Sequence, residues 1–463
     1  MMKKLIRLFS QSLSLYKQKK VAIRHTTWYD KQKKHFEVTQ MNQPLFTEHR
    51  SMYSSTRKDP TVIRIRIRMR DLIDPDCMRS AVDTTMTRYP YLCVELKNRE
   101  GNRWEFIDNE RPVIIIHSLS GVELNSEASN YHMISFSWQD NWVIMDVFHA
   151  LTDGTGAYEV VRTFLYYYCS KRYHAEISED SVRLAGEVIG AEEWDDPVLK
   201  ATDLPTPPRV DMPTALHPVT AAHLEEDTVP TVYSIAVDEK EFMRFNIEND
   251  GSPATMISLL LSRAIAKLYP NREDLIRVTM TVNQRKALGT PMAHQSLVGG
   301  AFLEYSDTLK DWPLDRQATA YRGMVFAQTR EEAVLAGVAS MKGMTQMLMS
   351  KETDQERLGI IKMIGEMTNR LVTATVSYVG KAGFRDSEDY IRDFRLWTSG
   401  TGTFLLLEIS AVGGRFTIDY LQSFSSPLYV NAFLKELEEN GIKYDLQDVM
   451  KLELPNVHLP WSE

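Results

Sequence analysis

Cysteine is scarce in this chain. The three cysteines among its 463 residues, Cys77, Cys93 and Cys169, form no CxxC pair and are odd in number. A disulfide framework and a cysteine-rich zinc site are therefore not expected. No apolar run reaches the ~18 residues that a membrane span requires. The basic start, MMKKLIRLFSQSLSLYKQKK, has Arg7 inside its apolar stretch and no small-residue cleavage site, unlike a secretory signal. These absences predict a cytoplasmic protein.

The common catalytic signatures are also missing. The chain contains no GxxxxGK[ST] phosphate loop, no GxGxxG, no GxSxG nucleophile elbow and no HExxH. Nucleotide hydrolysis, dinucleotide redox chemistry, serine-esterase chemistry and zinc proteolysis lose most of their support. We expect no metal ion and no tightly bound cofactor.

Positive charge is in deficit, because 54 Lys and Arg residues face 62 Asp and Glu residues, for a net charge of −8. This balance argues against a general nucleic-acid binder. Residues 1–50 nevertheless hold 11 basic and 3 acidic residues, a local charge of +8. Residues 4–20 have apolar side chains at helical spacing among lysines. They predict either a helix packed on its own domain, which is favoured, or peripheral membrane contact through residues 1–20.

The composition, with 43% hydrophobic and 25% charged residues, is that of a globular protein. Residues 61–69, TVIRIRIRM, alternate apolar and basic side chains, which predicts a half-buried strand with its arginines in solvent. Asp74 and Pro75 are typical of a helix start, and a helix is expected to run to Pro90. Short strands then lead to NWVIMDVF, residues 141–148, and to a helix near 154–170.

Residues 171–230 interrupt this pattern, with 13 acidic and 5 basic residues and little sign of regular structure. Strands and helices alternate again after them. The expected architecture is α/β, an α+β two-layer arrangement in two parts. The predicted divisions are a basic N-terminal segment (1–50), a first domain (51–172), a proline-rich acidic crossover (173–230) and a second domain (231–463).

The sequence His149-Ala-Leu-Thr-Asp153-Gly154 stands where a strand gives way to a helix. A rigid strand-to-helix turn can present a side chain into a cleft. A histidine with an aspartate four residues later occurs by chance about as often as not in a chain of this size. His223 and Asp227 repeat the spacing, but they lie in the acidic crossover with no strand before them. We therefore take His149 as the candidate site residue and His223 as a solvated loop residue.

The unperturbed pKa of histidine lies near neutrality, which suits a general base whose orientation is held. Asp153 could bond the ring of His149, or lock the turn by pairing elsewhere. The alternative is a buried structural histidine followed by an aspartate that caps a helix. The motif alone leaves these interpretations open.

HALTDG after an apolar strand resembles the HxxxDG motif of the CoA-dependent acyltransferase superfamily, which includes chloramphenicol acetyltransferase and peptide-synthetase condensation domains. Residues 61–96 resemble its first strand, first helix and following turn. TMTVNQRKALG resembles its Asn-x-Arg element, here Asn283 and Arg285, and ATVSYVG resembles a later strand that retains Ser377. Condensation domains usually have two adjacent histidines, and Phe148 takes the first place here. The chain is therefore most similar to alcohol acetyltransferase-like proteins.

The resemblance implies two chloramphenicol-acetyltransferase-like domains around a central tunnel, with His149 at its centre. His149 would be the general base of transfer from an acyl-CoA co-substrate to an alcohol or amine. Asp153 would turn away from the substrate and pair with Arg285. Gly154 and Asn283 would support the site, and Ser377 is the favoured oxyanion donor, ahead of Thr398 and Ser399.

Two other functions stay open. One is condensation-type transfer from a carrier-protein thioester, with an acyl carrier protein as partner. The other is a catalytically silent relative that binds a ligand. A monomer is expected in each case, because two fused halves suffice for one site. Methionines at helical spacing favour core filling over a pliable wall for an acyl chain; they are Met341, Met344, Met347, Met349, Met363 and Met367.

Overall fold

The computed structural model describes residues 49–99, 103–207, 211–227, 229–399 and 404–461. The helix expected over residues 4–20 lies outside the described residues. No helix in the described part of the chain is long and apolar enough to cross a membrane.

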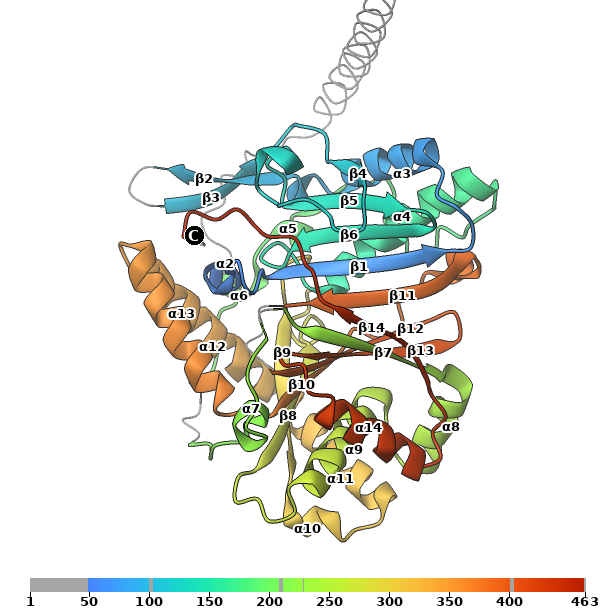
Figure 1. The fold of residues 1–463 in the computed structure, drawn as a ribbon. Coiled ribbons are helices and arrows are strands. Elements are labelled where there is room, and N and C mark those ends of the chain that lie inside the picture. Colours follow the sequence, from blue (N-terminus) through green and yellow to red (C-terminus); the bar gives the residue numbers. More distant parts are fainter. Residues whose placement is uncertain (1–48, 100–102, 208–210, 228, 400–403, 462–463) are drawn as a thin grey trace, which may run out of the picture. The chain divides into compact units, whose positions relative to one another are not determined.

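A five-stranded sheet holds most of the strands from the first half of the chain (Figure 1). Its strands, in spatial order, are β11 (Ile391–Thr398), β1 (Val62–Met69), β6 (Trp142–Phe148), β5 (Ile134–Gln139) and β4 (Ile115–His117). β1 pairs antiparallel with β6 on one side and with β11 on the other. This sheet therefore includes a strand from the second half of the chain.

Helices α3 (Pro75–Arg88) and α4 (Gly154–Tyr173) pack against each other beside the first sheet. Both begin as the sequence predicts. Asp74 caps α3 by accepting a hydrogen bond from the backbone N–H of Cys77 at 2.8 Å, with Pro75 at the first helical position. The ring of Phe164 in α4 lies 5.7 Å from that of Phe136 in β5, so α4 covers the sheet.

The second large sheet has seven strands. Its order is β14 (Asp445–Lys451), β7 (Thr231–Asp238), β13 (Arg415–Gln422), β12 (Leu405–Val412), β10 (Ala374–Tyr378), β8 (Ile276–Asn283) and β9 (Val298–Tyr305). β8, β10 and β12 run parallel, and the other pairs are antiparallel.

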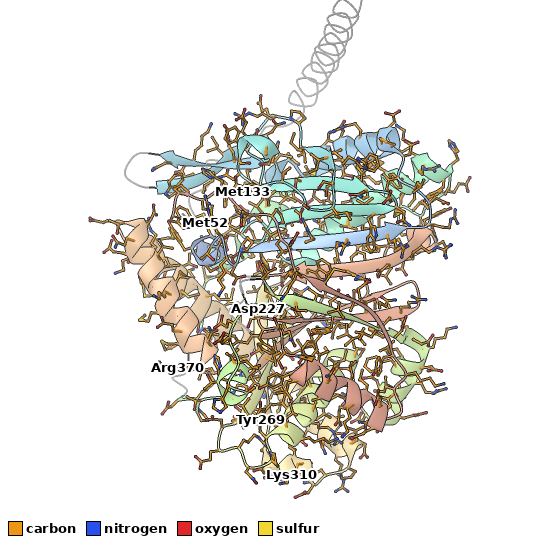
Figure 2. The ribbon with its side chains drawn as sticks, in the orientation of Figure 1. Met52, Met133, Asp227, Tyr269, Lys310 and Arg370 are labelled. Atoms are coloured by element: carbon orange, nitrogen blue, oxygen red, sulfur yellow. The ribbon has the colours of Figure 1, made fainter. Side chains whose placement is uncertain are left out.

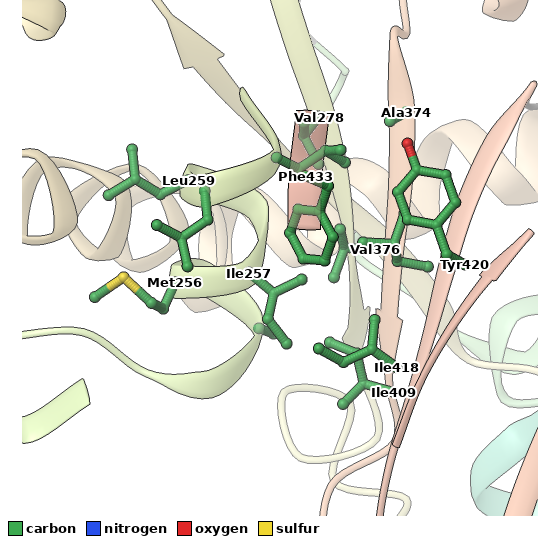
Figure 3. Packing of buried hydrophobic residues seen from close by; sticks show 14 of the residues in the cluster. Met256, Ile257, Leu259, Val278, Ala374, Val376, Ile409, Ile418, Tyr420 and Phe433 are labelled. Atoms are coloured by element: carbon green, nitrogen blue, oxygen red, sulfur yellow. The ribbon is translucent and has the colours of Figure 1, made fainter. Parts of the chain in front are cut away.

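Three helices, α9 (Pro253–Leu268), α11 (Leu314–Gln328) and α14 (Leu428–Glu439), bury the main hydrophobic core against one face of this sheet. Figure 3 shows Ile257 of α9 and Phe433 of α14 packed against Val376 of β10. The other face meets β11, where Trp397 is buried with Leu406 and Leu421. β11 therefore belongs to the first sheet and packs on the second.

The remaining described helices and strands are short or peripheral. A separate two-stranded sheet contains β2 (Val94–Arg99) and β3 (Arg103–Asp108). The crossover carries only α5 (Ala191–Trp194), α6 (Pro197–Lys200) and α7 (Pro218–Ala221) among its described residues, so the expectation of little regular structure is confirmed. The other helices are α2 (His49–Ser54), α8 (Glu239–Glu248), α10 (Asp307–Lys310), α12 (Glu331–Met349), α13 (Asp354–Asn369), and the 3₁₀ turns Pro90–Leu92, Glu127–Ser129 and Arg385–Tyr390.

The prediction that the arginines of β1 lie in solvent is wrong for two of the three. The side chain of Arg64 is 4% exposed and forms an ion pair with Asp146 of β6, Nε to Oδ1 at 2.7 Å. The guanidinium of Arg66 lies between the rings of Trp142 and Trp397, 4.6 and 4.7 Å from their centroids. The carbonyl of Glu453 also accepts from Arg64 at 2.7 Å. The chain's C-terminal part covers this face, which local alternation does not reveal.

The expectation that the methionines fill the core is also wrong for most of α12 and α13. Met341 is buried, but Met347, Met349, Met363 and Met367 are exposed, the last at 60%. α13 has a single buried residue, Arg357. Its apolar spacing is helical, but little of the protein packs on it.

Candidate active site

His149 directly follows the last residue of β6, and its backbone N–H donates to the carbonyl of Thr61 at 2.9 Å. This bond anchors the residue to the start of β1. The imidazole is partly exposed. Its Nδ1 is buried and has no hydrogen-bond partner among the described residues. Nε2 is therefore the ring nitrogen that a ligand can reach.

Asp153 does not bond this ring. Its side chain is fully buried, and it caps α4 by accepting from the backbone N–H of Gly156 at 3.0 Å. Both carboxylate oxygens also bind the guanidinium of Arg285, at 2.8 and 2.9 Å. The backbone N–H of Leu297 donates a further bond at 3.0 Å. The carboxylate of Asp153 therefore holds the turn by pairing with Arg285 and does not orient the ring of His149.

Arg285 is held as firmly as its partner. Its Nε donates to the carbonyl of Ala293 at 2.8 Å, and Nη2 donates to that of Gln295 at 3.0 Å. Asn283 accepts from the backbone N–H of Arg285 at 3.0 Å and donates to the hydroxyl of Thr155 at 3.3 Å. The end of β8 is thus joined to the start of α4, so residues far apart in sequence hold the turn after His149.

Two glycines let this first turn of α4 approach its neighbours closely. A Cβ on Gly154 would lie 2.7 Å from Cγ2 of Val379, which follows β10. A Cβ on Gly156 would overlap with Oγ1 of Thr152 and lie 3.1 Å from the backbone oxygen of His294. Because real Cβ atoms do not come this near, both positions need glycine.

The Gly156→Ala variant should lower the free energy of unfolding by about 1–3 kcal/mol, the usual cost of overpacking a buried site. Urea unfolding measures it. Gly359→Ala on α13 is the matched control, because no atom of the described residues lies within 4 Å of the added methyl group. That variant should gain about 0.5–1 kcal/mol from helix propensity. Equal shifts in the two variants would contradict the close approach.

The candidate oxyanion donors lie at the ends of β10 and β11. Ser377 is half-buried and pairs in register with Glu408 of β12, so the two side chains lie on the same face of the sheet. The hydroxyl of Thr398 donates to Oε1 of Glu408 at 2.5 Å. Ser399 donates to the carbonyl of Pro60. The hydroxyls of Thr398 and Ser399 are therefore already bonded to protein oxygens, whereas Ser377 is next to Glu408 in the sheet.

The sequence patterns did not point to Glu408 as a site residue. The one available signal is that an acidic residue inside FLLLEIS is unusual for a buried strand. Burial raises the pKa of Glu408 to about 7, while the hydroxyls of Thr398 and Ser377 lower the pKa and nearby Asp419 raises it. Burial likewise raises the pKa of Asp419 to about 6. The carboxyl of Glu408 therefore exchanges its proton near neutral pH.

The other histidines have distinct surroundings. His294 is buried against the rings of Tyr89 and Tyr91, and neither ring nitrogen has a partner among the described residues. Burial and nearby arginines hold its pKa well below the usual value, so it is neutral. His132 is buried and its Nε2 bonds the carbonyl of Arg111 at 2.7 Å. His117 is exposed beside Trp138.

The second pair with the same spacing forms no site. His223 is exposed, as expected. Asp227, labelled in Figure 2, accepts from Nζ of Lys451 in β14 at 2.9 Å. Across the ranges that the structure describes, no group of three or more His, Cys, Asp or Glu side chains could hold a metal ion.

No family model and no curated protein matches this chain. Solved structures do. Polyketide synthase associated protein 5 from Mycobacterium tuberculosis matches with a TM-score of 0.57 and 13% identity over 85% of this chain and 97% of its own. TRI101 of F. sporotrichioides, complexed with coenzyme A and T-2, matches with a TM-score of 0.55 and 12% identity over 87% of this chain and 99% of its own. The first condensation domain of the CDA synthetase matches with a TM-score of 0.55 and 13% identity over 86% of this chain and 95% of its own.

The chain has the fold of these proteins. The expected fold class, α/β of the two-part acyltransferase and condensation-domain type, is confirmed. The central tunnel and the division at residues 172 and 231 stay predictions. At 12–13% identity the likeness extends to the fold alone, so the roles of His149 and its neighbours depend on their geometry in this chain.

Proposed function

We propose that this protein is an acyltransferase that moves an acyl group from an acyl-CoA thioester to an alcohol or amine, with His149 as the general base. The observation that carries the proposal is the open Nε2 of His149 on a turn held by the buried pair of Asp153 and Arg285. A general base is useful when its position is maintained by its surroundings. The shared fold with TRI101, whose structure contains coenzyme A, supports a CoA donor.

In the proposed reaction, Nε2 of His149 takes the proton of the acceptor O–H or N–H as that atom attacks the thioester carbonyl. The C–S bond then breaks, and the proton returns from His149 to the departing sulfur. The products are an ester or amide and free CoA thiol. Asp153 touches no reacting atom in this scheme. With Arg285, Asn283 and Gly154 it positions the turn that carries the base.

The test is acceptor-dependent release of CoA thiol from a panel of acyl-CoAs with mixed alcohols and amines, with the product identified by mass spectrometry. His149→Ala should lower the rate about 100-fold or more, the usual contribution of a positioned base. His223→Ala is the matched control and should keep the parental rate. A folded His149→Ala protein that turns over as fast as the parent would refute the assignment.

A carrier-protein thioester is the second candidate donor, favoured by the fold shared with a condensation domain. The chain outside residues 1–50 has a net charge of −16, which disfavours an acidic carrier, whereas the basic residues 1–50 could offset this. Transfer from an acylated carrier protein, with none from acyl-CoA, would select this donor. Transfer from neither donor would favour the catalytically silent binding protein.

A further inference from the structure

Glu408 is a buried carboxyl that the proposed mechanism does not yet use. Its side chain is 4% exposed, and no lysine or arginine among the described residues forms an ion pair with it. It accepts a hydrogen bond from the hydroxyl of Thr398 in β11, and it pairs in register with Ser377 of β10. Because an unpaired buried carboxylate is costly, such a group is a candidate for a functional role.

This cluster lies beside the first turn of α4. The atoms nearest to a Cβ on Gly154 belong to Val379 and Leu396, each two residues from a member of the cluster, Ser377 and Thr398 respectively. The first sheet gives a second link. Thr398 pairs with Ile63, and Ile63 pairs with Val147, two residues before His149. Paired residues in a sheet share a face, so Thr398 lies on the same face of the first sheet as Val147. It also lies at the edge of that sheet where the chain continues from β6 to His149.

The protonation state of Glu408 decides where the two hydroxyl protons point. As a carboxylate, Glu408 can only accept, so the hydroxyls of Thr398 and of the neighbouring Ser377 can bond to it only as donors. As a carboxylic acid, it can donate to Ser377 while still accepting from Thr398. The hydroxyl of Ser377 then accepts one bond and its own proton becomes available to another oxygen.

We propose that Glu408 is a positioning residue whose uncharged form frees the hydroxyl of Ser377 to donate to the thioester oxygen during transfer. This inference rests on the proposed acyltransferase function. It gives Ser377 a donor's role only when Glu408 holds its proton. The pKa of about 7 makes both states accessible near neutral pH.

Few other titratable groups in the part of the chain that the structure describes face Glu408. Asp419 of β13 is its register partner and raises its pKa, and the phenol of Tyr158 approaches from α4. The facing groups of β10 and β11 are the hydroxyls already named. Activity should therefore fall as pH rises past the pKa of Glu408, since ionisation draws both hydroxyl protons to the carboxylate.

The experiment is kcat/KM against pH for the parent and Glu408→Gln, with an alcohol acceptor that does not titrate. The parent should lose about tenfold per pH unit above the pKa, as expected for one essential proton. The glutamine amide can donate to Ser377 and accept from Thr398 at every pH, so the variant should keep its activity to pH 9. Ser377→Ala should be slower than the parent at pH 6 and lack the alkaline decline.

Asp419→Asn provides the matched control, because it removes a neighbouring buried carboxyl and leaves Glu408 in place. Its alkaline decline should persist and move to lower pH. The same decline in Glu408→Gln as in the parent, in folded protein, would overturn the inference and leave the acyltransferase assignment intact. A parent that transfers no acyl group from any donor would overturn both.

Discussion

Replacing Asp153 by alanine should lower the free energy of unfolding by about 3–5 kcal/mol, the range seen when one partner of a buried ion pair is removed. Arg285 has a side chain only 5% exposed and would keep its charge with no anion beside it. The variant also loses the cap of α4 and the acceptor for the backbone N–H of Leu297. Urea unfolding at pH 7 measures the change.

Two comparisons test this explanation. Glu248→Ala removes a partner of Arg244 from an ion pair whose side chains are 64% and 69% exposed, so it should change stability little. The double variant Asp153→Ala/Arg285→Met should be less destabilised than the sum of its single variants, because the unpaired charge is gone. An Asp153→Ala protein as stable as Glu248→Ala would contradict the buried pair.

Glu408→Gln should change how stability depends on pH. The folded pKa of about 7 lies above the ordinary glutamate pKa of 4.5, so between these values the native state keeps a proton that the unfolded chain has released. The free energy of unfolding of the parent therefore falls as pH rises from about 4.5 through 7. At 1.36 kcal/mol per pH unit, the loss is on the order of 3 kcal/mol.

The variant lacks this group and should not show this part of the loss. Urea unfolding at pH 5 and pH 8, for both proteins, gives the difference without any substrate. Asp419, whose pKa is also raised, is present in both proteins, so its contribution largely cancels. Parallel stability profiles would show that Glu408 is ionised in the folded protein throughout this range.

Local patterns predicted much of the fold. The alternation in residues 61–69 and the apolar stretch before His149 became β1 and β6, and the Asp-Pro start became the cap of α3. Pairing across long separations was not predictable in this way. Nothing in the local sequence of β11 indicates that it pairs with β1, because strand pairing and register depend on partners distant in sequence.

The same distinction between local patterns and distant contacts applies to the residues of the candidate site. His149 was found because a strand and a glycine-bearing helix start flank it, and Arg285 was named through the resemblance rather than from local chemistry. Glu408 was not found, because its surroundings come from β10, β11 and β13 as well as its own strand. The burial of Arg64 was missed for a similar reason, since segments near Glu453 cover it.

The place of β11 has a consequence for the order of folding during synthesis. β1 has hydrogen-bonding partners on both sides, and one of them ends at Thr398. Until that residue leaves the ribosome, the outer edge of β1 presents unpaired N–H and C=O groups with alternating apolar side chains, the kind of edge that pairs with other chains. The region around His149 can therefore reach its final form only late in translation, so we expect nascent chains truncated before residue 391 to need protection from aggregation.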